Sequence, residues 1–369
     1  MAHPRSLTRP IAFRLGAWGV AAATCAVIAA GPAAADTHPG TYGDFAPIER
    51  SISLPRDESS HRQPAEWWYM TGHLTGVDPA GKTRHYGYEI VVFQIAAVAG
   101  VPPIYDSHFA ISDLGRHKFS YAEHTTAGAY STTPNAVDQD VAGFRITGSM
   151  GHYAASASQP GYSLDIRTTA LVPPTLNGVN GIETFGDWVS PYYSYTSNAT
   201  VGTLIDHGVP VKITGNSWYD HEWATGAPGT DGTGWSWFGV SLDNNVQYNL
   251  SFFQAPSGEV QKVIAVRTAD GHYAPVPADQ VSMQPIGAWR SPHTGYTYPT
   301  SWRITLPGGA ITLTPKIQDS ELSGGVGHKF HYEGPTTVTG TLDGAPATGN
   351  AYAEMNPRGV NWRPDQLLP

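Results

Sequence analysis

Cysteine is almost absent from this chain. Cys25 is the only cysteine, and it lies in an N-terminal stretch that we expect to be removed. The remaining chain then has no thiol nucleophile and can form no disulfide, even in an oxidising compartment. Its stability must therefore come from the burial of apolar side chains.

Basic residues are also scarce. The chain has 21 Lys and Arg against 30 Asp and Glu, a formal net charge of -9. Arg5, Arg9 and Arg14 belong to the N-terminal stretch, so the remainder has 18 basic and 30 acidic residues, or -12. A chain with this balance lacks the positive surface that attracts phosphate groups. We therefore expect neither nucleic acid nor an anionic membrane as a partner.

The N-terminal apolar run is short for a membrane span. It extends from Leu15 to Ala30, is interrupted by glycines and a threonine, and is followed by Ala33-Ala34-Ala35 before Asp36. A positive start, a short apolar core and small residues at the end are typical of a cleavable signal peptide. We predict a signal peptide at residues 1–35, a secreted or periplasmic mature protein and no stable membrane anchor.

Several catalytic motifs are missing. No G-x-S-x-G sequence occurs, which argues against a serine hydrolase of the α/β type. His221-Glu222 does not extend to H-E-x-x-H, because Thr225 occupies the position of the second histidine. The glycine-rich stretch 324–327 has no strand-to-helix context and does not indicate a phosphate loop. We expect no metal site and no cofactor.

Turn-forming and aromatic residues, in contrast, are abundant. The chain has 41 Gly, 30 Pro, 19 Tyr and 11 Trp, a composition that favours an all-β protein over a helical one. Strand-like alternation begins at Glu66–Thr75, and the clearest hairpin joins Trp235–Leu242 to Val246–Gln254 through an Asp-Asn-Asn turn. The segment Leu171–Ser190 has no period and is predicted to be a long loop. About 330 residues after the signal peptide suggest two domains.

Carboxylates occur among aromatic residues at two places far apart in the sequence. Asn216–Trp223 reads Asn-Ser-Trp-Tyr-Asp-His-Glu-Trp, and Glu66–Tyr69 reads Glu-Trp-Trp-Tyr. A carboxyl group walled by aromatic rings loses solvation of its charge, so its pKa rises and it can donate a proton near neutral pH. The alternative is that these are ordinary strand residues, whose carboxylates face solvent or pair with arginine.

Strand alternation limits which of these groups can share a site. In an extended Tyr219–Trp223, Asp220 and Glu222 point to one face, and Tyr219, His221 and Trp223 point to the other. Both sets can line one cavity only if the strand is bulged or bent. We favour Asp220 as the acid, with Glu222 as second choice and His221 presented through a local irregularity.

The chain resembles a known family, the AttH and carotenoid 1,2-hydratase group, which includes kievitone hydratase. The motifs that carry the resemblance follow the family's order over nearly the whole mature chain. They lie at Glu66–Leu74, Tyr86–Ile90, Phe93–Gln94, His108–Asp113, Ser217–Trp223, Gly234–Phe238, Tyr298–Trp302, Tyr332–Gly334 and Gly349–Glu354. The resemblance implies two consecutive lipocalin-like antiparallel β-barrel domains, which we place at residues 36–215 and 216–369.

The resemblance also implies chemistry without a cofactor, namely the addition of water to an isoprenoid or prenyl double bond of a lipophilic small molecule. Such a hydratase needs an acid, a shielded cation and a placed water. The candidate catalytic residues are Asp220, His221, Glu222, Glu66 and His108. The candidate substrate-binding residues are Trp68, Tyr69, Glu89, Gln94, Trp218, Tyr219, Trp223 and Trp237. For Glu66 and Glu89 a structural role is an equal alternative. The alternatives for the whole protein are a non-catalytic carrier of a hydrophobic ligand and a pericyclase of the same fold.

Overall fold

The computed structural model describes residues 44–96, 99–186, 188–226, 232–323 and 330–359. Strands form nearly all of its regular structure, and the helices of the described chain are two short 3₁₀ turns, η1 (Arg56–Glu58) and η2 (Ala278–Gln280). The predicted all-β class is confirmed. Among these residues no helix has the length and apolar character needed to span a bilayer. The predicted signal peptide and the glycine-rich stretch 324–327 lie outside the described residues.

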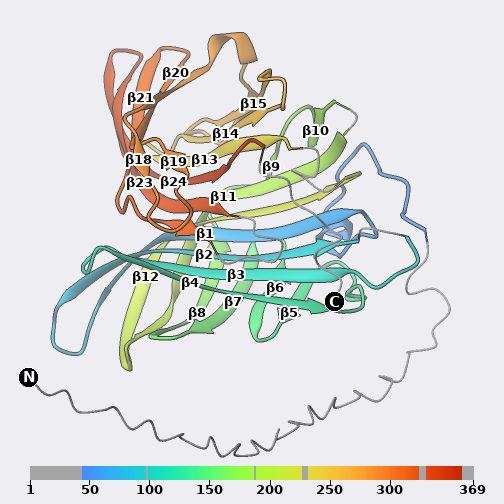
Figure 1. The fold of residues 1–369 in the computed structure, drawn as a ribbon, viewed down its shortest axis with the longest axis horizontal. Helices are drawn as coiled ribbons and strands as arrows, with labels where there is room; N and C mark the ends of the chain where they lie inside the picture. The colour runs from blue at the N-terminus through green and yellow to red at the C-terminus, as the bar shows by residue number, and fades with distance from the viewer. Residues whose placement is uncertain (1–43, 97–98, 187, 227–231, 324–329, 360–369) are drawn as a thin grey trace, which may run out of the picture. The chain divides into compact units, whose positions relative to one another are not determined.

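The first sheet contains the strands of the N-terminal part of the chain (Figure 1). Its strands are β1 (Ala65–Val77), β2 (Thr83–Ile95), β3 (Ile104–Asp113), β4 (Lys118–Ala127), β5 (Val137–Val141), β6 (Phe144–Ser149), β7 (His152–Gln159), β8 (Tyr162–Ala170), β9 (Thr175–Leu176), β10 (Ile182–Phe185), β11 (Trp188–Asp206) and β12 (Val209–Ala224). The order across the sheet is β4-β3-β2-β1-β12-β11-β8-β7-β6-β5, with β9 and β10 added on β11. All pairs are antiparallel, and the sheet curls into a nearly closed barrel around one apolar core.

The second sheet repeats this plan with fewer strands. Its strands are β13 (Gly234–Leu242), β14 (Gln247–Gln254), β15 (Val260–Arg267), β16 (Tyr273–Pro275), β17 (Ser282–Ile286), β20 (Ser301–Leu306), β21 (Gly309–Pro315), β22 (Glu321–Leu322), β23 (His331–Leu342) and β24 (Ala345–Asn356). Their order is β16-β15-β14-β13-β24-β23-β21-β20-β17, with β22 on β23, and they form a half-barrel. A separate ribbon pairs β18 (Trp289–Arg290) with β19 (Thr297–Tyr298). In both sheets the first strand lies beside the last, and the predicted hairpin is confirmed as β13 and β14.

The two sheets pack face to face. In Figure 1 the yellow-to-red strands of the second sheet lie against the blue and yellow-green strands β1, β2, β11 and β12. The contact contains a separate apolar cluster, made of Tyr69, Val91, Trp218, Trp237 and Tyr352. Tyr69, Val91 and Trp218 come from the outer face of the first barrel, and Trp237 and Tyr352 come from the second sheet. Part of the outer face of the barrel is therefore buried by the second sheet.

The segment predicted as a long loop contains two short strands. β9 and β10 both pair with β11, so the prediction was wrong for these residues. The buried Arg267 of β15 attaches the segment to the second sheet, because its guanidinium donates to Thr175 Oγ1 at 3.0 Å and to the Pro174 carbonyl at 3.0 Å. Such contacts between distant residues carry no local sequence period, so the pattern of the segment alone did not indicate them.

The predicted division between residues 215 and 216 falls inside β12. This strand pairs with β1 and β11 over its length and belongs wholly to the first sheet. The chain passes from one sheet to the other between Ala224 and Gly234, and the described residues belong to one compact unit. The motif 216–223, which we placed at the start of the second domain, therefore closes the first barrel.

Gly87 provides a test of the contact between the sheets. A Cβ atom at Gly87 would lie 2.6 Å from Cγ of Pro335 in β23, so Gly87→Ala forces β2 and β23 apart. We expect a loss of about 1–3 kcal/mol in the free energy of unfolding, as for overpacked cores, measured by denaturant titration. Gly115→Ala is the control, since its Cβ would meet only Asp113 Oδ1 at 3.4 Å. Equal stability of the two variants would contradict a tight interface at Gly87.

Candidate functional site

Strand β12 separates the predicted site residues into two groups. Its pairing with β1 is regular from Lys212 to Ala224, so the irregularity that we expected near His221 is absent. Tyr219 and Trp223 belong to the core of the first barrel, whereas Trp218 belongs to the cluster between the sheets. His221 and Asp220 therefore lie on opposite faces of one strand and do not share a site.

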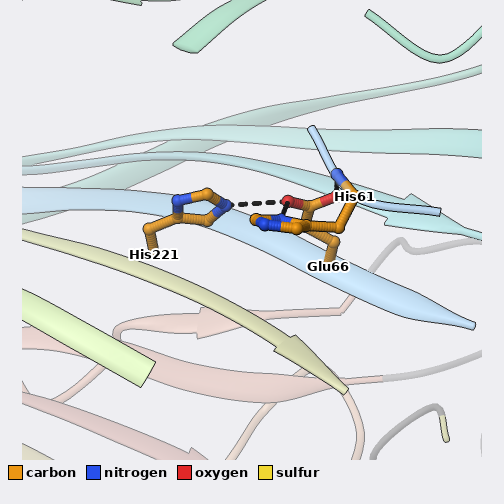
Figure 2. Close-up of side chains that lie close together, drawn as sticks. All are labelled: His61, Glu66 and His221. Carbon is orange, nitrogen blue, oxygen red and sulfur yellow. Dashed lines mark hydrogen bonds and ion pairs between the residues drawn. The ribbon is translucent and has the colours of Figure 1, made fainter. Parts of the chain in front are cut away.

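Inside the first barrel, His221 meets Glu66 and His61 (Figure 2). The Oε1 atom of Glu66 is 2.8 Å from His221 Nε2 and 2.8 Å from His61 Nδ1. The other oxygen, Oε2, accepts hydrogen bonds from the backbone N–H of His61 at 2.7 Å and from Gln94 Nε2 at 2.9 Å. The ring of His61 stacks on Trp223 with a centroid distance of 3.9 Å.

This cluster behaves as an ion pair with a neutral neighbour. Burial opposes charge on both partners, but the attraction between Glu66 and His61 outweighs it, lowering the pKa of Glu66 and raising the pKa of His61 to about 9. Burial lowers the pKa of His221, so His221 is neutral and donates from Nε2 to the carboxylate. Its Nδ1 then accepts from the Tyr193 hydroxyl at 3.1 Å.

His61, Glu66 and His221 are also the described residues whose ligand atoms lie close enough together to hold a metal ion. Two imidazoles and a carboxylate suit zinc or iron. Here, however, the carboxylate oxygens are already satisfied by protein donors. The contacts are those of a closed hydrogen-bonded cluster, which fixes the segment before β1 to the end of the barrel.

A second site, a cavity, lies between the two sheets. Its walls are mainly aromatic, and its polar groups are mostly carboxyls from both sheets. The aromatic lining consists of Trp67, Tyr69, Phe93, Trp188, Tyr192, Trp235, Trp237 and Phe253. The carboxyl groups are those of Glu183, Asp220, Glu222, Glu333 and Glu354, with Asp106 and Glu123 near the two histidines described below.

Asp220 and Glu222 each accept a hydrogen bond from a serine of β11. Ser194 donates to Asp220 Oδ1, which also accepts from Trp218 Nε1 at 2.7 Å. Ser190 donates to Glu222 Oε1 at 2.5 Å. Tyr192 is a further hydrogen-bonding neighbour of Asp220.

Burial raises the pKa values of this carboxyl group cluster. For Asp220 the pKa rises to about 7, and the hydrogen bonds from Ser194 and Trp218 limit the rise. Burial raises the pKa of Glu183 to about 8, with a further contribution from the charge of Asp220. Burial and the nearby Glu183 raise the pKa of Glu222 well above its usual value. At neutral pH Glu183 and Glu222 are therefore mainly protonated, and Asp220 is close to half protonated.

The second sheet adds its own acids opposite this cluster. Glu333 of β23 and Glu354 of β24 are cross-strand neighbours. Glu333 accepts a hydrogen bond from the Tyr69 hydroxyl at 3.0 Å, and Glu354 accepts one from Trp235 Nε1 at 2.9 Å. Burial and the proximity of Glu354 raise the pKa of Glu333 well above its usual value. The cavity therefore brings together protonated acids from both halves of the chain.

A pair of histidines lies at another part of the cavity wall. His108 of β3 and His331 of β23 face each other across the two sheets, with ring centroids 5.4 Å apart. His108 Nε2 is 3.3 Å from Asp106 Oδ2 and 3.9 Å from Glu123 Oε1. Burial opposes the charge of His108, but Asp106 and Glu123 outweigh it and raise its pKa to about 9.

The predicted site residues are distributed between the two sites. Asp220, Glu222, His108, Tyr69 and Trp237 line the cavity, and Trp218 lies directly behind it. Glu66 borders the cavity, but its carboxylate points to His221. His221, Trp68, Gln94, Tyr219 and Trp223 are inside the first barrel. Glu89 is buried on the cavity side of β2 without lining the cavity, and burial raises its pKa to about 8.

Sequence reasoning missed several residues of the cavity. They are Glu183, Glu333, Glu354, His331, Trp67, Trp188, Trp235 and Phe253. Glu333 and Glu354 lie in two of the motifs that carry the family resemblance, which was a usable signal. Glu183 lies in the stretch without a period, and no signal in the sequence pointed to it.

The buried acids predict an unusual dependence of stability on pH. Below pH 3.8, the ordinary pKa of aspartate, Asp220 is protonated in both the folded and the unfolded chain. Between pH 3.8 and about 7 it ionises only in the unfolded chain, so the free energy of unfolding falls as the pH rises through this range. Asp220→Asn removes this cost. We expect the variant to gain stability over the wild type as pH rises from 4 to 7, by a few kcal/mol at about 1.4 kcal/mol per unit of pKa difference. Thermal unfolding over this pH range would show it, and a stability difference independent of pH would contradict a protonated Asp220.

Comparison with known proteins is consistent with this architecture. A curated relative, the dehydratase asqC of Emericella nidulans, is 23% identical over 343 residues, covering 88% of this chain and 93% of that protein. The solved structure of an AttH protein from Nitrosomonas europaea superposes with a TM-score of 0.75 at 27% identity, covering 86% of this chain and 100% of the other. Kievitone hydratase from Nectria haematococca has the same fold, with a TM-score of 0.67 at 18% identity over 87% of this chain and 98% of the other. The AttH-like family pattern matches residues 46–358, and the chain belongs to the AttH-like family.

Proposed function

We propose that this protein is a hydro-lyase that adds water to, or removes it from, a carbon–carbon double bond of a lipophilic small molecule. The observation that carries the proposal is the set of buried, protonated carboxyls in an aromatic cavity, with Asp220 at its centre. The names of two relatives, a dehydratase and a hydratase, agree with this reaction class. The aromatic lining favours a largely apolar substrate, for which we propose an isoprenoid or prenyl alkene.

Asp220 is the proposed acid. Ser194 and Trp218 both donate to Oδ1, so they stabilise the carboxylate that remains when Asp220 transfers its proton. A pKa of about 7 is well matched to proton transfer at neutral pH. The proton adds to one alkene carbon, water attacks the other, and the attacking water returns a proton to the Asp220 carboxylate. The sum is alkene plus water giving an alcohol, and dehydration is the same path in reverse.

The aromatic walls would stabilise the intermediate cation. Trp237 packs edge to face against both Tyr69 and Trp218, and Trp67 lies beside Glu222 on the neighbouring strand. Each ring face that meets a cation contributes about 0.5–2 kcal/mol. Glu222, which stays protonated, is proposed to hold the reacting water by hydrogen bonding. His221 takes no part, because it lies inside the first barrel.

Export is a further part of the proposal. The support is the pattern of residues 1–35, with arginines, a short apolar run and small residues before Asp36. The mature protein would then act outside the cytoplasm.

Isotope labelling tests the reaction. We expect prenylated phenols or linear terpenoids incubated with the protein in water labelled with heavy oxygen to gain one labelled water, detected by mass spectrometry. Asp220→Asn should lower the rate by at least about a hundredfold, since general acid catalysis contributes about 10²–10⁴-fold. Glu222→Gln keeps a neutral hydrogen-bonding side chain and should lose less.

The control is Asp165→Asn, which changes an exposed carboxylate on β8. Tight binding of such compounds without any incorporation of label, in the wild type and in Asp220→Asn alike, would contradict the proposal and favour a carrier.

A further inference from the structure

His108 has a hydrogen-bond donor that the protein does not use. Its side chain is buried and lines the cavity between Phe93, at a centroid distance of 5.5 Å, and His331. Nε2 faces Asp106 and Glu123, so it carries the proton shared with these carboxylates. Among the described residues, Nδ1 is buried and has no hydrogen-bond partner.

The charge state of His108 makes this nitrogen a donor. Asp106 and Glu123 overcome burial and raise its pKa to about 9, so both ring nitrogens carry protons at neutral pH. Glu89, on the adjacent strand β2, also favours the charged ring. A buried N–H group without an acceptor is costly. An oxygen atom of a bound molecule would satisfy it.

The distance between His108 and the acid follows from the register of the sheet. His108 pairs with Val91, Val91 pairs with Tyr69, and Tyr69 pairs with Asp220. These positions form one row across β3, β2, β1 and β12, so His108 and Asp220 are three strands apart, or about 14 Å at about 4.8 Å per strand. His108, one of the catalytic candidates of the sequence analysis, therefore lies too far away to take a proton from a water that reacts at Asp220.

Between the two ends, the wall that the first sheet contributes is largely apolar, and its polar group is the Tyr69 hydroxyl, which donates to Glu333. In this row Tyr69 lines the cavity and Val91 is buried in the cluster between the sheets; the neighbouring row adds Phe93 and Trp67 to the lining. Residues of the second sheet, including Trp237, form the opposite wall. This arrangement suits an extended molecule with an apolar middle.

We propose that the imidazole of His108 binds an oxygen atom, of a carbonyl or hydroxyl group, at the end of the ligand remote from Asp220. The ligand class is then an elongated, largely apolar molecule that carries its oxygen-bearing group roughly three strand spacings from the carbon–carbon bond that reacts. The assignment of the reacting end rests on the proposed function, whereas the binding of the oxygen at His108 does not.

Matched ligands test the proposal by binding alone. The probes are farnesylacetone and the hydrocarbon in which a methylidene group replaces its carbonyl oxygen, titrated by tryptophan fluorescence into protein carrying Asp220→Asn, so that turnover is removed. We expect the ketone to bind about ten- to a hundredfold more tightly, since the hydrogen bond involves a charged donor. Adding His108→Phe, which keeps a ring of similar size, should abolish the preference.

Two further variants complete the test. His108→Gln keeps an N–H donor and should retain part of the preference, which separates loss of the hydrogen bond from a fold disturbed by the phenylalanine. His152→Phe, at an exposed position of β7, should leave the preference unchanged. Equal affinities for the two probes with His108 present, or a preference that survives His108→Phe, would overturn the proposal. Failure of the labelling experiment would leave this affinity ratio intact, so the two proposals fail separately.

Discussion

The alternation of side chains along β12 is the constraint on which both sites depend. In an unbulged strand successive residues face opposite sides, and β12 is the strand that has the barrel core on one side and the second sheet on the other. A single run of residues therefore supplies His221 to the hydrogen-bonded cluster of the first barrel and Asp220 with Glu222 to the cavity. A shift of one residue in its pairing with β1 would exchange the two sets and destroy both sites.

Burial of the outer face of the first barrel keeps its carboxyl groups protonated. On a free barrel, Asp220 and Glu222 would face water and be ionised. Here the second sheet covers them with tryptophans and adds Glu333 and Glu354, so burial and mutual repulsion keep protons on the group. This arrangement lowers the free energy of unfolding at neutral pH, as is common where function requires unfavourable burial. Asp220 and Glu222 each accept from a serine of β11, but Asp220 also accepts from Trp218, and these hydrogen bonds favour its ionised form.

Much of the fold and part of the site could be predicted from the sequence. The composition and the short alternating segments indicated an all-β chain, and the period of two correctly placed Asp220 and Glu222 opposite His221. The partners of these residues could not be derived in the same way. Glu333 and Glu354 approach Asp220 only because two sheets pack face to face, and Glu183 does so because β10 pairs with β11 at the edge of the cavity. The long-range contacts of Arg267 that hold this segment leave no period in the sequence.

The most direct test of the central claim is the protonation state of Asp220. Infrared difference spectra between the wild type and Asp220→Asn, recorded from pH 5 to 9 with carbon-13-labelled aspartate, distinguish the C=O stretch of a protonated carboxyl from the bands of a carboxylate. The account predicts a protonated, label-sensitive band at pH 5 that is absent in the variant and disappears around pH 7. A carboxylate signal for Asp220 already at pH 5 would contradict it, because an ordinary ionised aspartate cannot serve as the acid of this cavity.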